Sequence, residues 1–159
     1  FEDEIDNLIF DRQSLRTFLK KCRAEPWSVQ LDGKDFSGEY LLVEIMNLDR
    51  VGPRLKLAPA ADPADGLLDV VFITERDREA LNDYLDNESV DEHAPAHFVV
   101  QSATQVSVEW DGSNFHLDSH VFARGRHLLK AIETPDDSVT KRIDIRLKRH
   151  ALRLLGCPL

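Results

Sequence analysis

The chain has 159 residues, 42% hydrophobic and 31% charged, a composition typical of one globular domain with its own core. Cys22 and Cys157 lie far apart without metal-ligand spacing, which indicates no disulfide framework and favours a reducing, cytoplasmic compartment. The net charge of −9 argues against a nucleic-acid partner, and the longest uncharged apolar runs fall short of the 18 residues that would predict a membrane-spanning helix.

The charge is unevenly distributed. From Val139 onward six basic residues stand against one acid, Asp144, so this tail carries +5 and the remainder −14. Such a tail could approach anionic lipid headgroups or an acidic neighbouring domain, and a solvated helix face is the simpler alternative. The chain begins at Phe1 and an acidic run, without an initiator Met or a signal peptide, so we expect a piece of a longer protein.

The first half of the chain predicts a helix followed by strands. Apolar residues at three-to-four spacing predict a helix over 11–25, which Pro26 ends. Alternation then predicts a strand over 27–31 that stops at the turn dipeptide Asp32-Gly33. The next strand is expected over 40–46, as the partner of 27–31 across a long loop. A Pro- and Gly-punctuated stretch separates it from an apolar strand over 67–74 and a short helix over 76–85.

The second half predicts further strands over 97–101, 105–110, 115–122 and 126–132, with a turn at Asp111-Gly112. Residues 138–155 fit either a final helix or, because Ile143, Ile145 and Leu147 alternate, a strand. Short strands with frequent turns predict a mostly β fold, a two-layer antiparallel β-sandwich with flanking helices. We expect one domain over 1–159, made of the helix 11–25, the sandwich 27–132 and a basic tail 133–159.

A proline-containing loop carries the most specific pattern. Pro59 and Pro63 stiffen the segment Leu57–Val70, and Asp65-Gly66 leads it into a buried strand. Such a loop can direct carbonyl oxygens and a carboxylate inward, which suits a hard cation. The alternative is that Asp65-Gly66 only turns the chain.

The segment resembles the diacylglycerol kinase and bacterial lipid kinase family, which includes sphingosine kinases. The C-terminal domain of that family has a strand ending in Asn, a Gly-containing loop, and L-A-P-x-A-x-x-x-D-G-x-L. The resemblance extends over about 11–132 and includes QVSVEWDG and the later GRHLL. The matching elements here are Asn47, Gly52, Leu57-Ala58-Pro59, Ala61, Asp65-Gly66 and Leu68.

The resemblance implies a structural Mg²⁺ at the proline loop. Its ligands would be the side chain of Asp65 and the backbone carbonyls of Asp62 and Leu67. Oxygen ligands of this kind are the ones that Mg²⁺ prefers.

The resemblance also implies a catalytic position at an Asp-Gly-Glu motif, which reads Asp111-Gly112-Ser113 here. Asp111 would lie near the ATP phosphates and magnesium or accept the proton of the substrate hydroxyl. Ser113 replaces the Glu in a cofactor-contacting position, and a hydroxyl cannot supply its negative charge. The family's glycine-rich G-G-D-G-T segment, which cradles ATP, does not occur in this sequence. We therefore expect ATP to bind mostly through a missing N-terminal nucleotide-binding domain, and the chain alone to be inactive.

The implied function is that of one half of an ATP-dependent kinase for diacylglycerol or a sphingoid base. The expected partners are the lipid substrate, the nucleotide-binding domain of the same protein, a membrane surface approached peripherally and a second copy of the chain. One alternative is a non-catalytic lipid-binding or regulatory module, which Ser113 supports. Another is an enzyme similar to NAD kinase, which the proline loop fits less well.

Overall fold

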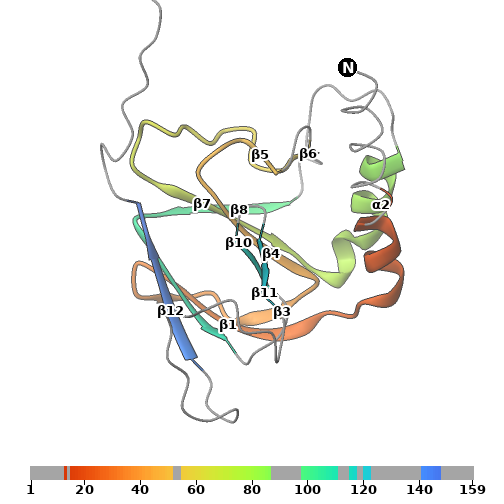
Figure 1. Cartoon of the computed structure of the whole chain (residues 1–159), viewed down its shortest axis with the longest axis horizontal. Helices are drawn as coiled ribbons and strands as arrows, with labels where there is room; N and C mark the ends of the chain where they lie inside the picture. Colours follow the sequence, from red (N-terminus) through yellow and green to blue (C-terminus); the bar gives the residue numbers. More distant parts are fainter. Residues whose placement is uncertain are drawn as a thin grey trace, which may run out of the picture.

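A computed structural model describes residues 13, 15–51, 55–86, 98–110, 115–117, 120–122 and 141–147. Most of these residues form antiparallel strands, and two helices accompany them (Figure 1). Residues 13 and 15–21 form the first of these, called the leading helix below. The other elements are β1 (Glu25–Leu31), β2 (Lys34–Asp35), β3 (Gly38–Tyr40), β4 (Leu42–Met46), β5 (Arg50–Val51), β6 (Leu55–Lys56), β7 (Leu68–Ile73), the 3₁₀ turn η1 (Glu75–Asp77), α2 (Arg78–Asp86), β8 (Val99–Ala103), β9 (Gln105–Trp110), β10 (Phe115–Leu117), β11 (His120–Phe122) and β12 (Lys141–Arg146).

One layer of the fold is a sheet with the strand order β12-β9-β1-β2, in which β3 also pairs with β1. The predicted turn at Asp32-Gly33 joins β1 to β2, and both residues have positive φ, 49° and 79°. A two-residue hairpin turn of this kind needs positive φ, which Asp tolerates and Gly adopts without strain. Asp32 also accepts hydrogen bonds from Thr104 and Gln105, so its carboxylate ties this turn to the β8–β9 corner.

The other layer is the antiparallel sheet β4-β7-β8. The strand expected over 40–46 is therefore present as β4, but its expected partner was wrong. β4 pairs with β7, while β3 takes the place beside β1. The cause is the polar segment after Asp32-Gly33, which turns back on β1 at once, as β2 and β3.

The two sheets face each other across an apolar core, as the predicted sandwich requires. Alternate residues of β1, β7 and β9 point into it, in agreement with the two-residue period of strands. Phe72 belongs to this core, and the centroid of its ring is 4.9 Å from that of Tyr40 and 5.9 Å from that of Phe36. This intersheet core consists of Val29, Leu31, Leu68, Val70, Phe72, Ala103, Val106 and Val108.

A second apolar cluster, called the helix-side core below, covers the opposite face of β4-β7-β8. The leading helix contributes Leu19, α2 contributes Leu81 and Leu85, and the proline loop contributes Leu57. Figure 1 shows both helices beside the sheet β4-β7-β8, called the middle sheet below, with β1, β9 and β12 on its other side. β7 lies between the two cores, so all six of its residues are buried.

Other elements also differ from the prediction. The leading helix stops at residue 21, not 25, because Glu25 and Pro26 already pair with β3. The strand expected over 115–122 is a hairpin of two short strands, β10 and β11. The hairpin β5–β6 was not predicted, because its strands have two residues each beside Gly52 and Pro53. The strand expected over 126–132 lies outside the described residues.

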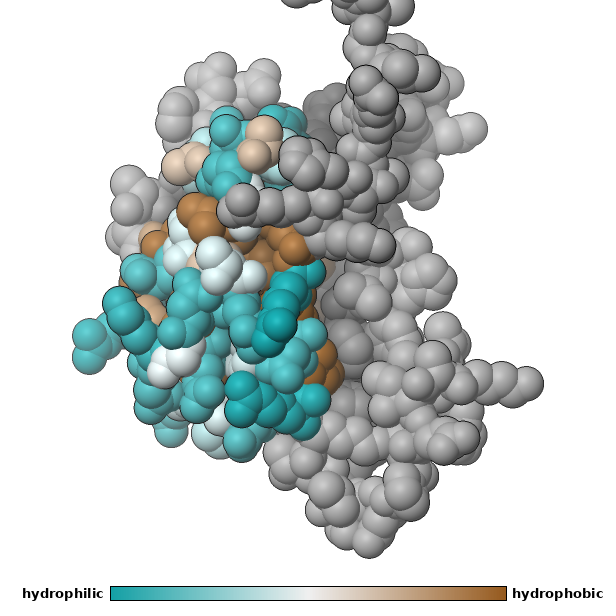
Figure 2. All heavy atoms as spheres, turned by 90° about the vertical axis from the view of Figure 1, so that its left-hand side faces the viewer, coloured by the Kyte–Doolittle hydropathy of each residue, from teal (hydrophilic) through white to brown (hydrophobic). Residues whose placement is uncertain are grey.

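The alternation of Ile143, Ile145 and Leu147 correctly indicates a strand for part of the basic tail. β12 pairs with β9 in register, with Ile143 opposite Val108 and Ile145 opposite Val106. Ile145 packs against the intersheet core, and Arg142 and Arg146 are exposed. Seen from the side that carries β12 in Figure 1, the described surface is mainly hydrophilic (Figure 2).

Candidate functional site

The proline loop runs from β6 to β7 and is held at its start by burial. Leu57 and Ala58 are each 1% exposed and belong to the helix-side core. The N–H of Ala58 donates to the carbonyl of Asp49 at 3.1 Å, which ties the loop to the segment that follows β4. From residue 59 to residue 65 the loop is largely exposed. Its two ends are thus fixed by the fold, while its middle is open to solvent.

Asp62 and Asp65 organise the exposed part through local hydrogen bonds. Asp62 Oδ1 accepts from the N–H of Ala64 at 2.8 Å, and Asp65 Oδ1 accepts from the N–H of Leu67 at 2.7 Å. The N–H of Asp65 also donates to the carbonyl of Asp62 at 3.2 Å. Gly66 completes the turn with a φ of 79°, which a residue with a Cβ would adopt only with strain.

The chemistry of this turn fits a hard cation. Asp65 keeps its second carboxylate oxygen outside the bond to Leu67, and the carbonyls of Asp62 and Leu67 lie in the same turn. A single carboxylate with two carbonyls leaves about half of the octahedral coordination of Mg²⁺ to water, and this ion usually keeps several waters. In the part of the chain that the structure describes, no three His, Cys, Asp or Glu side chains gather into a denser metal site.

Asp111 and Ser113 lie outside the described residues. The flanking backbone is described: β9 ends at Trp110 and β10 begins at Phe115. β9 is hydrogen-bonded to β12 on one side and to β1 on the other. The predicted catalytic position therefore directly follows an inner strand of the sheet.

Sequence reasoning missed two acids in the middle sheet. Asp69 on β7 is 6% exposed and accepts a hydrogen bond of 2.8 Å from the Ser102 hydroxyl on β8. Glu44 on β4 is half-buried, and burial raises the pKa of its carboxyl to about 7. Both sit within apolar runs that predict strands. An acidic residue inside an otherwise apolar run was the sequence signal that could have identified them.

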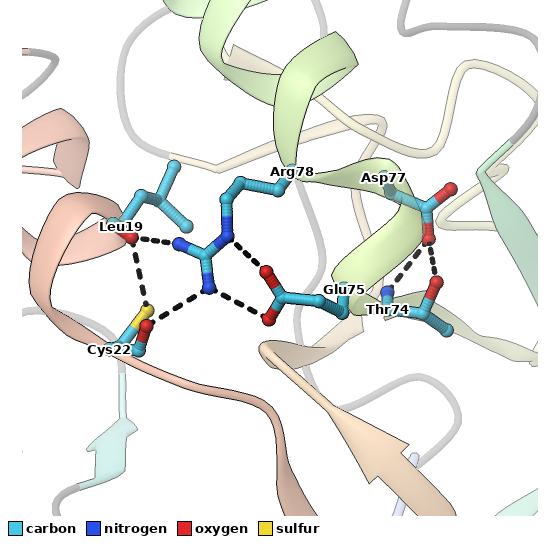
Figure 3. A network of polar contacts seen from close by, with 6 residues as sticks. All are labelled: Leu19, Cys22, Thr74, Glu75, Asp77 and Arg78. Atoms are coloured by element: carbon cyan, nitrogen blue, oxygen red, sulfur yellow. Dashed lines mark hydrogen bonds and ion pairs between the residues drawn. The ribbon is translucent and has the colours of Figure 1, made fainter.

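A polar network near the leading helix joins it to α2 (Figure 3). The Arg78 guanidinium donates to the carbonyls of Leu19 and Cys22, the latter at 3.0 Å, and to both carboxylate oxygens of Glu75. The hydrogen bonds between Arg78 and Glu75 lower the pKa of Glu75 and raise that of Arg78. An open groove of about 530 Å³ adjoins this network, and Lys20, Arg23 and Glu39 contribute to its lining. Because acceptors within the protein already bind the guanidinium, we assign this network a structural role.

A family model of the YegS C-terminal NAD kinase β-sandwich-like domain matches residues 5–128. The chain belongs to this family. The expected resemblance and the predicted mostly β sandwich are both confirmed. A comparison with the curated proteins finds no match.

The chain is also similar to solved structures from Bacillus anthracis str. Sterne. A candidate diacylglycerol kinase is 20% identical with a TM-score of 0.54, over 85% of this chain and 41% of that one. A second candidate diacylglycerol kinase is 23% identical with a TM-score of 0.47, over 60% of this chain and 33% of that one. At these identities the likeness concerns the fold. The chain spans less than half of the length of either structure.

Proposed function

We propose that this YegS-type domain is one half of an ATP-dependent lipid kinase, which phosphorylates the hydroxyl of diacylglycerol or of a sphingoid base. The family match carries the proposal, and the fit of the Asp62–Leu67 turn to a hard cation supports it. The remaining length of the similar structures is consistent with a nucleotide-binding domain outside this chain.

The proposed roles of the residues follow from their chemistry. Asp65, with the carbonyls of Asp62 and Leu67, would hold a structural Mg²⁺ beside the start of β7. Asp111, directly after β9, would accept the proton of the lipid hydroxyl or hold metal-bridged phosphate oxygens. Mg²⁺ would supply charge neutralisation at the phosphates, and ATP the phosphoryl group. Ser113 cannot contribute a charge, so the role of the family acid at that position would be lost or supplied from elsewhere.

The proposed setting is the cytoplasm, with peripheral contact to the membrane that holds the lipid. Among the described residues no helix is long and apolar enough to cross a membrane. We also propose the nucleotide-binding domain of the same protein and a second copy of the chain as partners.

Phosphoryl transfer from radiolabelled ATP tests the proposal, with the whole protein that carries this chain, Mg²⁺, and diacylglycerol, sphingosine or NAD as acceptor. We expect label in a lipid, and a loss of about 100-fold or more in Asp111→Asn, since general base catalysis contributes on that order. Asp83→Asn, an exposed acid on α2, is the matched control. Label in NAD alone would instead favour the NAD kinase alternative.

The same assay addresses the non-catalytic alternative, which Ser113 favours. A folded whole protein that binds lipid but transfers no label would contradict the kinase proposal and leave a lipid-binding module. For the metal, Mg²⁺ should raise the melting temperature of the chain, because a ligand that binds only the folded state stabilises it. Asp65→Asn should abolish that increase. An unchanged response would argue against the proposed ligand.

A further inference from the structure

β4 is an edge strand made mainly of apolar residues. In the part of the chain that the structure describes, β7 pairs with one side of β4 and no strand pairs with the other side, called its free edge below. The five residues are Leu42, Val43, Glu44, Ile45 and Met46, so one charge stands among four apolar side chains. A free, apolar edge is a template for a strand of another molecule, because its outward N–H and C=O groups lack partners. Such a strand needs a feature that prevents pairing.

The other edges among the described strands have features that limit pairing. β2, at one end of the sheet β12-β9-β1-β2, has only two residues. β12, at the other end of that sheet, carries Lys141, Arg142 and Arg146. β8, at the opposite edge of the middle sheet, has the polar Gln101 at its centre. Short strands and charged side chains are usual means by which proteins prevent edge pairing. In β4, only Glu44 can serve this purpose.

The side chain of Glu44 lies on the inner, helix-side face of β4. Glu44 pairs with Val71 on β7, which is 0% exposed and belongs to the helix-side core. None of the hydrogen bonds or ion pairs among the described residues includes Glu44, and burial alone raises its pKa. Its carboxylate oxygens are not among the fully enclosed polar atoms that lack a partner. Water therefore still reaches this half-buried carboxylate.

The sequence of β4 is complementary to itself except at Glu44. Two copies paired antiparallel about a twofold axis at this residue would set Leu42 opposite Met46 of the second copy and Val43 opposite Ile45 of the second copy. Both are apolar cross-strand pairs, which stabilise a sheet.

Glu44 makes the same pairing unfavourable. It would lie directly opposite Glu44 of the second copy, where like charges repel, and the added strand would remove the remaining water from both carboxylates. An enclosed carboxylate without a partner is strongly unfavourable. A register shifted by two residues would set Glu44 opposite Leu42 or Met46, with the same loss of water.

We propose that the charge of Glu44 keeps the free edge of β4 from pairing with β4 of a second copy. An unpaired acid costs the folded chain stability, and an apolar residue would pack at this position without that cost. Protection of the edge is the gain that offsets it. The inference does not depend on the kinase proposal, and the proposed contact with a second copy would use a different surface.

Sedimentation equilibrium of the chain at pH 8 tests the inference, because Glu44 is charged above its folded pKa of about 7. We expect Glu44→Val to lower the dissociation constant of self-association by at least about 100-fold, since valine can be enclosed without the penalty of a carboxylate. Glu44→Gln should also associate more tightly than the unaltered chain. Glu44→Lys, which restores a charge of opposite sign, should not. Glu39→Val, at an exposed position of β3, is the matched control.

Amide hydrogen exchange locates the contact, and urea denaturation verifies that each variant is folded. In Glu44→Val, the β4 amides at the free edge should exchange more slowly at high than at low protein concentration. Neutral variants at Glu44 that associate no more tightly than the unaltered chain would overturn the inference. Equal association of Glu39→Val or of Glu44→Lys would also overturn it, as would association that leaves the β4 amides unprotected.

Discussion

Single residues in this domain differ in how well the sequence predicts their role. Asp65 stands in a motif with fixed spacing, and local hydrogen bonds within the turn position its carboxylate, while its role as a metal ligand stays a prediction. Glu44 was missed because its setting depends on Val71 and Val100, which are distant in sequence and adjacent only through strand pairing. Asp111 and Ser113 remain predictions, since both lie outside the described residues.

The raised pKa of Glu44 predicts a specific dependence of stability on pH. The carboxyl titrates near 4.5 in the unfolded chain and at about 7 in the folded one. Between these values the folded state binds more protons, so the free energy of unfolding should fall as the pH rises from 4.5 through 7. A shift of this size corresponds to roughly 3 to 4 kcal/mol.

Urea denaturation of the chain from pH 4.5 to 8, without lipid, measures this effect. Glu44→Gln should be less sensitive to pH over that range and the more stable protein at pH 8. All other titratable groups are retained in both proteins, so the comparison isolates the effect of Glu44. Parallel pH profiles for the two proteins would contradict the assignment.

At the scale of elements, periodicity predicts the existence of strands and helices better than their partners. The apolar runs that became β1, β4, β7 and β9 were located from sequence to within a few residues. The pairing of β4 with β7 was not predicted from the sequence. β3 occupies the position beside β1, so β4 pairs with β7 in the other sheet, and this choice depends on contacts between segments that are distant in the sequence. The contact between the leading helix and α2 was likewise absent from the local sequence, since Arg78 reaches carbonyls 56 and 59 positions away.

Arg78 should therefore stabilise the packing of the leading helix. Arg78→Met keeps the apolar stem but leaves the carbonyls of Leu19 and Cys22 and the Glu75 carboxylate without their donor. We expect a loss of about 1 to 3 kcal/mol in the free energy of unfolding, measured by urea denaturation. Arg76→Met, an exposed arginine on η1, is the matched control. Equal effects of the two substitutions would show that the network contributes nothing beyond surface charge.

At the scale of the whole molecule, the sandwich architecture followed from short strands and frequent turns, and the family resemblance agreed with it. The part played by the basic tail did not follow. Its charge pattern is compatible with a solvated helix, and only the pairing of β12 with β9 shows that residues 141–146 complete the first sheet. The tail that carries six basic residues therefore begins as a strand of the sandwich.

If β12 belongs to the sandwich, its inward side chains should matter and its outward ones should not. Ile145→Ala removes half-buried methyl groups from the intersheet core and should lower the free energy of unfolding by about 1 to 2 kcal/mol. Arg146→Ala, one position along and exposed, should have little effect. Thermal denaturation followed by circular dichroism distinguishes them, and a neutral Ile145→Ala would place β12 outside the cooperative unit.

β7 is hydrogen-bonded to β4 and β8 and buried on both faces, with the intersheet core on one side and the helix-side core on the other. Opening it to solvent would require both cores to separate at once. Its amide protons should therefore exchange only through global unfolding, as the slowest set in the described part of the chain, whereas the exposed turn at Asp62–Asp65 can exchange by local opening. The metal-binding candidate would thus be free to adjust while the strand that directly follows it stays fixed.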